Sequence, residues 1–431
     1  MKYLTQILKS AWLMPVVALM MLVSSCNKDL EQFPEPVPTG LKLGELLKNN
    51  PDYSFYYAML NRGNLLSTIN DSSKVYTMFV SDNAGVAKFL SAITGTPIPY
   101  PGVDDGVILG IINTQVTPEQ AAGVVLYNTI PQLIKSSSIS NAFPSFFYPS
   151  MINIDPRLPQ DPFLKLIVFP SSINGLWFNN IPIVSADQMA SNGVIHQTYT
   201  VSAPARRTLW DRINTDNELT YLKAAIQRAD SGALQFDSLK NYLNSDPSPD
   251  NHTLTVFSPL TVFAPVDTAF ESFVKNLLVA SGVPGFVADG LIYFYGPTII
   301  SNPGSINVPF FPDLGPSLAA AITPQLVKGL VVYHVFGKKV FTNNFPTTET
   351  AYPTLLNTIL TNHPGLKIKV TLAGSSPSLV VSATVKDAIP NKPAASIIMS
   401  GSQFIPDPVG SYDQNYVNGV LHKITSVLQP F

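Results

Sequence analysis

The apolar positions of the first half alternate between helical spacing and short continuous runs. Leucines in 41–50 and an apolar stripe in 53–61 predict two helices separated by Pro51. The run 75–80 predicts a strand, and Ser81-Asp82-Asn83 after it predicts the N-cap of a helix over 84–90. Thr117-Pro118 predicts the start of a further helix.

The second half repeats this order of elements. A helix is expected over 218–229, a strand over 261–265 and a helix from Asp267. Thr323-Pro324 then leads into the apolar run 331–334, which we interpret as a strand ending at Tyr333-His334.

Each half ends on a copy of one motif, Asn192-Gly193-Val194-Ile195-His196 and Asn418-Gly419-Val420-Leu421-His422. An Asn-Gly pair readily takes the two positive φ angles of a tight hairpin turn, and the aliphatic residues after it suit a strand. Each copy is therefore predicted to be a turn followed by the closing strand of a domain.

The spacing between matching positions grows along the chain. Phe55 and Tyr221, Phe79 and Phe263, Tyr127 and Tyr333, and His196 and His422 lie 166, 184, 206 and 226 residues apart. The second half therefore has the same scaffold with longer loops, the largest over 280–316 and 374–413.

Length and composition agree with two domains. A chain of 431 residues is long for one domain, and 45% apolar residues supply a core for each half. The 38 prolines and 25 glycines indicate many turns and irregular loops. Without the leader the chain has 24 basic and 28 acidic residues, so no basic face for nucleic acid is expected.

The first 25 residues have the pattern of an export signal. Lys2 and Lys9 precede the apolar run 11–23, which is short for a membrane-spanning helix, and Ser24-Ser25 precede Cys26, the single cysteine. This pattern resembles a bacterial lipobox, whose cysteine is acylated and becomes the new N-terminus. The alternative is an inert apolar cysteine at the end of the signal core. We expect acylated Cys26 to tether the protein to a lipid bilayer.

The segment 26–39 is predicted to be a tether. Asn27 to Glu31 is similar to the Lys-acidic signals that send lipoproteins of the Bacteroidota to the outer face of the outer membrane. A plain solvated linker on a periplasm-facing anchor is the alternative. Pro34, Pro36 and Pro38 then predict a stiff, extended spacer.

The strand-to-helix phrase 261–270, the Tyr333-His334 pair and the closing Asn-Gly-Val-Leu-His strand, in this order, resemble the fasciclin (FAS1) family, and the resemblance covers about 40–430. It implies an α+β fold of two tandem FAS1-like domains, 40–204 and 205–431, each a β-sandwich or wedge with several small helices. Domain one departs from the pattern, with Val80-Ser81 in place of Ala-Pro and Asn128 in place of His.

The resemblance implies a non-catalytic protein of the cell surface that binds extracellular matrix, glycan or a partner protein. The alternative is an accessory subunit that captures glycan or peptide for an outer-membrane transporter. We find no nucleophile elbow, no phosphate loop, no dinucleotide motif and no metal-ligand spacing in the sequence. No enzyme activity, metal or cofactor is therefore expected.

Aromatic residues in the predicted loops are the candidate binding residues, because exposed rings on rigid loops are platforms for sugars or proteins. Against this, such rings also fold back into the core of their own domain or close the junction between domains, and we favour that interpretation because large exposed apolar patches are rare. The candidates are Phe286, Tyr293, Tyr295, Phe310 and Phe311 in the second half and Tyr148 and Trp177 in the first.

The histidines of the repeated motifs are expected to be structural. His334 ends an apolar run, and His196 and His422 lie in equivalent strands. A single histidine among apolar residues is usually a buried imidazole bonded to the backbone. Tyr333, His334, His196 and His422 are therefore assigned to the scaffold.

Overall fold

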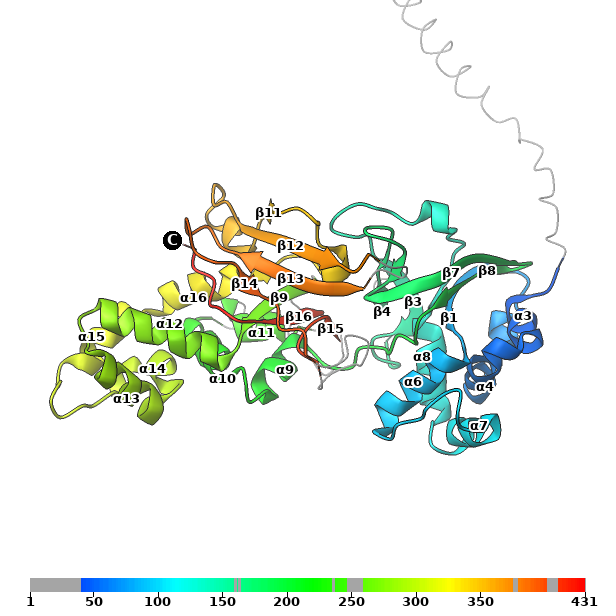
Figure 1. Ribbon diagram of the computed structural model, residues 1–431, viewed down its shortest axis with the longest axis horizontal. Helices are drawn as coiled ribbons and strands as arrows, with labels where there is room; N and C mark the ends of the chain where they lie inside the picture. Colours follow the sequence, from blue (N-terminus) through cyan, green and yellow to red (C-terminus); the bar gives the residue numbers. More distant parts are fainter. Residues whose placement is uncertain are drawn as a thin grey trace, which may run out of the picture. The chain divides into compact units, whose positions relative to one another are not determined.

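The computed structural model describes residues 40–158, 161, 164–234, 237–245, 259–374, 379–400 and 410–430. By contacts, Leu41–Phe431 is one compact unit. The predicted signal peptide, Cys26 and the proline-rich tether lie outside the described residues. Helices and several small sheets alternate along the chain (Figure 1), which confirms the predicted α+β class.

The first half begins with helices and continues with strands. Its helices are α3 (Leu43–Asn49), η1 (Pro51–Tyr53), α4 (Ser54–Arg62), α5 (Leu66–Ile69), α6 (Asn83–Thr94), α7 (Asp105–Thr114), α8 (Pro118–Tyr127) and η2 (Ser136–Ser138). Its strands are β1 (Tyr76–Ser81), β2 (Thr129–Ile130), β3 (Tyr148–Asn153), β4 (Lys165–Val168), β5 (Pro170–Ser171), β6 (Trp177–Phe178), β7 (Ile181–Ala190) and β8 (Gly193–Thr198).

The second half follows the same plan with more helices. These are α9 (Leu209–Thr215), α10 (Thr220–Ala229), α11 (Leu239–Leu243), α12 (Asp267–Ala280), α13 (Gly285–Tyr295), α14 (Thr298–Ser301), η5 (Pro303–Ser305), α15 (Leu314–Ala321), α16 (Pro324–Tyr333), η6 (Thr342–Asn344) and η7 (Leu355–Thr358). The strands are β9 (Leu260–Pro265), β10 (Val335–Phe336), β11 (Thr350–Tyr352), β12 (Leu366–Leu372), β13 (Val380–Lys386), β14 (Ala395–Ser396), β15 (Gln414–Tyr416) and β16 (Gly419–Ile424).

Most predicted elements are confirmed within one or two residues. The N-caps Asp82 and Thr117 each accept a hydrogen bond from a backbone amide of the first helical turn, as their positions predicted. The strand expected to end at Tyr333 is wrong, because 324–333 forms α16 and His334 caps its C-terminal end.

The same strand arrangement occurs once in each half. β8 pairs parallel with β1, which pairs antiparallel with β2, and β16 pairs parallel with β9, which pairs antiparallel with β10. The registers match as well, since His196 lies opposite Phe79 and His422 lies opposite Phe263. The two halves are thus a structural repeat, as the sequence spacing indicated.

The asparagine of each closing motif connects its strand to the first helix of its half. Asn192 accepts from the amide of Leu43 at 2.9 Å and donates to the carbonyl of Ile69 at 2.7 Å. The same two bonds, at the same distances, join Asn418 to Leu209 and Leu243. Because all three groups of each set are buried, these bonds satisfy polar atoms that have no access to water.

The predicted conformation of the Asn-Gly pair is wrong. The β7–β8 hairpin pairs Ala190 with Gly193, so Asn192 is the last turn residue, and neither it nor Asn418 has a positive φ. The glycine instead permits a close approach between strands, because a Cβ at Gly419 would lie 2.5 Å from the carbonyl oxygen of Leu260. The motif therefore fixes a buried strand junction and not a turn type.

Contacts between the two halves are polar as well as aromatic. Tyr127 accepts a hydrogen bond from Nδ2 of Asn415 at 2.9 Å, and Asn174 donates to the carbonyls of Asn343 and Phe345 at 2.9 Å. Buried apolar residues of both halves also share clusters, such as Val417 among side chains of the first half. The boundary proposed at 204/205 stays a prediction.

Candidate functional site

The candidate rings of the second half gather on α13. Phe286, Tyr293 and the neighbouring Phe294 are 80%, 84% and 79% exposed, whereas Ala288 and Leu291 on the opposite side of the helix are buried. Phe286 and Tyr293 are seven residues apart and so share one face. The rings of Tyr293 and Phe294 meet edge to face at 5.1 Å. α13 is thus apolar on both sides, and one of these sides is largely exposed.

The loop before α15 adds a further ring. Tyr295 is partly buried, and its hydroxyl donates to the carbonyl of Asn307 at 2.7 Å, which fastens this loop to the end of α13. Phe311 forms an isolated β-bridge with Val308 and is 39% exposed. Phe310 is 89% exposed, so the bridge holds the loop while Phe310 faces water.

We call Phe286, Tyr293, Phe294 and Phe310 the aromatic surface. Helices α13, α14 and α15 lie at the end of the second half farthest from β9 and β16 (Figure 1). An ion pair between Lys275 and Asp289, 2.6 Å apart, joins α12 to α13 nearby. The preferred interpretation that these rings fold back into the core is wrong for all four members. The arrangement offers apolar contact area to a ligand.

The corresponding rings of the first half behave differently. Trp177 is 1% exposed, and its indole nitrogen donates to the carbonyl of Asn174 at 3.3 Å, so the hypothesis of an exposed binding ring is wrong for it. Tyr148 is half-buried in β3. Phe143 packs on Tyr352 of the second half with ring centroids 4.3 Å apart, which is the junction-closing role that the sequence allowed.

His196 and His422 are fully buried parts of the repeated scaffold. Nε2 of His422 lies 3.1 Å from the carbonyl of Val340, and Nδ1 accepts from the backbone amide of Asp413 at 3.1 Å. His196 has equivalent partners in Ile134 and Asp187. Burial lowers the pKa of His422 to about 4 and also lowers that of His196. Both imidazoles are therefore neutral and structural, and neither is placed to take part in chemistry.

His334 is buried too, although it caps a helix instead of ending a strand. Nδ1 lies 2.8 Å from the carbonyl of Leu330, and Nε2 accepts from the amide of Leu428 at 2.9 Å. The neighbouring hydroxyl of Tyr333 donates to the carbonyl of Gly365 at 2.9 Å. The bond from Leu428 attaches the C-terminal segment to the end of α16, and the bond of Tyr333 attaches the segment of Gly365 to the same end.

The first half reaches the same arrangement with a different residue. Asn128 donates from Nδ2 to the carbonyl of Val124 at 2.8 Å and accepts from the amide of Ser202 at 3.3 Å. His334 provides the same two interactions. One ring nitrogen bonds the carbonyl four residues earlier, and the other accepts from an amide of the closing segment. The departure of domain one from the family pattern thus preserves both hydrogen bonds.

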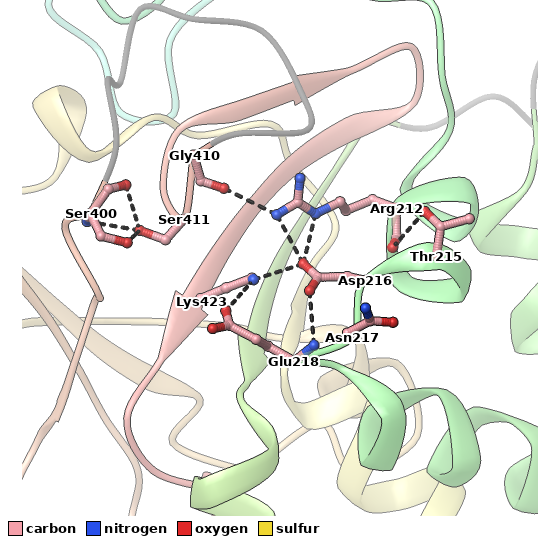
Figure 2. Close-up of a pocket in the computed structure, with 9 residues that line it drawn as sticks. All are labelled: Arg212, Thr215, Asp216, Asn217, Glu218, Ser400, Gly410, Ser411 and Lys423. Carbon is pink, nitrogen blue, oxygen red and sulfur yellow. Dashed lines mark hydrogen bonds and ion pairs between the residues drawn. The ribbon is translucent and has the colours of Figure 1, made fainter.

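A polar cavity of about 400 Å³ in the second half was not predicted. Arg212 from α9 and Lys423 from β16 enter it, and both bind the same carboxylate oxygen, Oδ2 of Asp216, at 2.8 and 2.7 Å. Lys423 also reaches Oε2 of Glu218 at 2.6 Å. Figure 2 shows Arg212, Asp216, Glu218 and Lys423 converging, with Asn217, Ser400 and Ser411 elsewhere in the lining of the same cavity.

The charges of the cavity hold one another in the ionised state. Burial alone raises the pKa of Asp216, but the hydrogen bond from Lys423, the amide of Glu218 and the charges of Arg212 and Lys423 outweigh it and lower that pKa overall. Arg212 and Asp216 at i and i+4 were visible in the sequence as a helical pair. Lys423 was not, because only the parallel pairing of β16 with β9 brings it there.

Among the comparisons with known proteins, only the search of solved structures shows a likeness. No family model matches the sequence, and no curated protein is significantly similar to it. Among solved structures the chain is similar to a FAS1 domain pair from the insect cell adhesion molecule fasciclin I, with 14% sequence identity and a TM-score of 0.29. The match covers 87% of this chain and 95% of that chain. At this TM-score the two whole chains do not superpose closely, so the description of a duplicated α+β fold rests on the repeated contacts within this chain.

Proposed function

We propose that the protein is a non-catalytic binding protein of the FAS1 type, which uses the aromatic surface of its second half to hold a protein partner outside the cell. The observation that carries this proposal is the exposure of four aromatic rings, three on α13 and one in the loop that Tyr295 joins to the end of this helix. Contiguous exposed apolar surface is costly for a soluble protein and marks interaction sites.

The composition of the aromatic surface favours a protein over a glycan. Three of its four rings are phenylalanines, which have no polar group to bond with sugar hydroxyls. Leu277 and Val279 near the end of α12 are exposed apolar residues as well. Aromatic residues at the centre with charged residues at the edge are typical of protein interfaces. The Lys275–Asp289 pair supplies such an edge.

The location of the protein is part of the proposal. Cys26 and the proline-rich segment 26–39 are proposed to anchor the protein to the outer membrane with its domains facing the exterior. Replacing Cys26 by Ala is expected to move the protein from the membrane fraction to the soluble fraction. Continued sedimentation of the Cys26→Ala protein with outer membranes would contradict the lipid tether.

The binding proposal can be tested with the soluble Cys26→Ala protein and outer-membrane vesicles from the source cells. Removing two rings by Phe286→Ser and Phe294→Ser is expected to weaken binding about tenfold or more, since buried aromatic anchors dominate interfaces. Phe146→Ser with Phe147→Ser is the matched control, because these first-half rings are also exposed but lie on another surface.

Treating the vesicles with protease separates the two classes of ligand. Loss of binding after protease treatment supports a protein partner, including a subunit of a nutrient transporter. Binding that survives the protease, or that the Phe286→Ser and Phe294→Ser protein retains in full, would overturn the proposal. Co-purification of a transporter with the wild-type protein, and not with the variant, would favour the accessory-subunit alternative over attachment to other cells or matrix.

A further inference from the structure

The polar cavity around Arg212 and Lys423 has no role in the proposed binding surface. Both cationic side chains are at least nine-tenths buried, and they converge on one oxygen of Asp216. The cavity volume of about 400 Å³ lies within the range of small-molecule sites. Figure 2 shows the residues that line the cavity, which come from the end of α9, the residues just after it, β16 and the segment of Ser411.

The scaffold itself does not require these charges. By the offsets of the repeat, Leu46, Asn50 and Gln197 of the first half correspond to Arg212, Asp216 and Lys423. Gln197 lies opposite Val80 in β1 as Lys423 lies opposite Ala264 in β9. The first half therefore builds the same helix and the same strand pairing with neutral residues at all three positions.

Local geometry confirms that the positions correspond. Oδ1 of Asn50 accepts from the amide of Asp52 at 3.0 Å, and Oδ1 of Asp216 accepts from the amide of Glu218 at 2.9 Å. An asparagine satisfies this turn as well as an aspartate does. Buried ion pairs are weak devices for stability, since desolvation offsets their attraction. The added charges of the second half thus call for another explanation.

The charge balance shows where an anion could enter. Arg212 and Lys423 are two buried cations that share the single buried carboxylate of Asp216. The fourth charge is Glu218, whose side chain is 69% exposed. It lies at the surface, and its Oε2 is 2.6 Å from Nζ of Lys423. A carboxylate that enters from solvent can take the place of Glu218 on Lys423 without breaking the buried pair.

We propose that this cavity binds an acidic sugar, with the ligand carboxylate replacing Glu218 on Lys423. Thr215, Asn217 and Ser400 also line the cavity, are exposed and carry hydroxyl or amide groups, which suits a ligand rich in hydroxyl groups. An inorganic anion needs neither this volume nor these groups. The ligand class is therefore a hexuronic acid, either free or as a residue of an acidic polysaccharide.

Calorimetric titration of the purified full chain tests this site. Sodium glucuronate is expected to bind, and glucose, the matched neutral sugar, is expected to bind at least about tenfold more weakly because it cannot pair with Lys423. Equal affinities, or no heat from glucuronate at millimolar concentration, would overturn the proposal. Sulfate bound as tightly as glucuronate would overturn the sugar assignment. A glucuronate oligosaccharide that binds more tightly than the monomer identifies the polysaccharide as the source, and equal binding identifies the free sugar.

Two variants locate the binding. Glu218→Gln removes the competing carboxylate and is expected to tighten glucuronate binding about threefold to tenfold, whereas Asp52→Asn, its first-half counterpart, leaves binding unchanged. Lys423→Gln copies Gln197 and is expected to abolish binding. An unchanged affinity in Glu218→Gln would refute the displacement, and this variant decides the question even if Lys423→Gln fails to fold. Binding that persists in Phe286→Ser separates this site from the aromatic surface.

Discussion

The backbone amide of Leu428 donates to Nε2 of His334 at 2.9 Å, so a buried imidazole joins the last residues of the chain to the end of α16. This bond requires Nε2 to be an acceptor, and protonation of His334 would break it. Asn128 makes the equivalent bond to Ser202 in the first half without a titrating group. The two halves therefore differ in their sensitivity to pH at one matched position.

We predict that His334→Asn reduces the loss of stability in acid. Burial lowers the pKa of His334 from 6.5 to about 4, so between these pH values the unfolded chain binds the extra proton and stability falls as pH falls. This group alone contributes a loss of about 3 kcal/mol across that window. Urea unfolding at both pH values should show a smaller difference for His334→Asn than for the wild type.

His196 and His422 titrate in both proteins, so subtracting the two pH profiles isolates His334. Asp413 acts in the opposite direction, because burial raises its pKa to about 6 and its protonation in the folded state favours folding as pH falls. It is also present in both proteins. Identical pH profiles for the wild type and His334→Asn would contradict the prediction.

Lys339 is expected to cost the protein stability at neutral pH. Its side chain is buried, donates to the carbonyl of Tyr416 at 3.0 Å and lies over the ring of Phe169, and burial lowers its pKa to about 7. Between pH 7 and 10.5 the unfolded chain holds more protons, so stability rises with pH through this window. The destabilisation by buried Lys339 is therefore largest below about pH 7.

The effect of Lys339→Met on the free energy of unfolding should therefore have opposite signs at the two ends of this pH window. At pH 7 we expect the variant to be about 2 kcal/mol more stable, as relief of desolvation exceeds the lost hydrogen bond. Near pH 10.5 the neutral amine costs nothing, and the variant should be less stable because the carbonyl of Tyr416 has lost this donor. Lys338→Met, at an exposed neighbouring residue, is the control in chemical unfolding at both pH values. A constant difference at the two pH values would show that Lys339 keeps an ordinary pKa.

The sequence predicted the repeat because the residues that define it are bound to one another in the same way in each half. The spacing of His196 from Phe79 and of His422 from Phe263 differs through the segments between them, which include added helices as well as loops, whereas the strand register between each pair is the same. Loops change length without moving the strands they join. The sequence offsets between matching strand positions therefore identified the repeat correctly despite the insertions.

Other features depend on long-range contacts that no local pattern encodes. The run before Tyr333 was assigned to a strand because a short apolar run fits a buried strand and a buried helix equally well. The aromatic surface was expected to be buried, because a local pattern does not show whether the second side of α13 is covered by other elements. Lys423 joins Arg212 only through strand pairing between segments about two hundred residues apart.

The asparagines of the closing motifs should be as important as any apolar core residue. Asn192→Ala and Asn418→Ala each remove the two matched hydrogen bonds, to a buried amide and a buried carbonyl, and Asn192→Ala also removes a longer one to the carbonyl of Asp71. We expect each substitution to destabilise the protein by about 2 to 4 kcal/mol. Asn217→Ala, at an exposed position, serves as the control in thermal unfolding. A cost below that of the control would show that the asparagines act only through the turn.

The aromatic residues can be sorted by stability as well as by binding. Phe310→Ser should leave the melting temperature nearly unchanged because its ring is 89% exposed, whereas Trp177→Ser removes a buried ring and should cost about 3 to 5 kcal/mol. Phe311→Ser should fall between them, since Phe311 is half-covered and its backbone bridges to Val308. Differential scanning calorimetry of the three variants measures this order directly. A large loss in Phe310→Ser would mean that its ring is covered in solution, and Phe310 would then have to be removed from the binding surface.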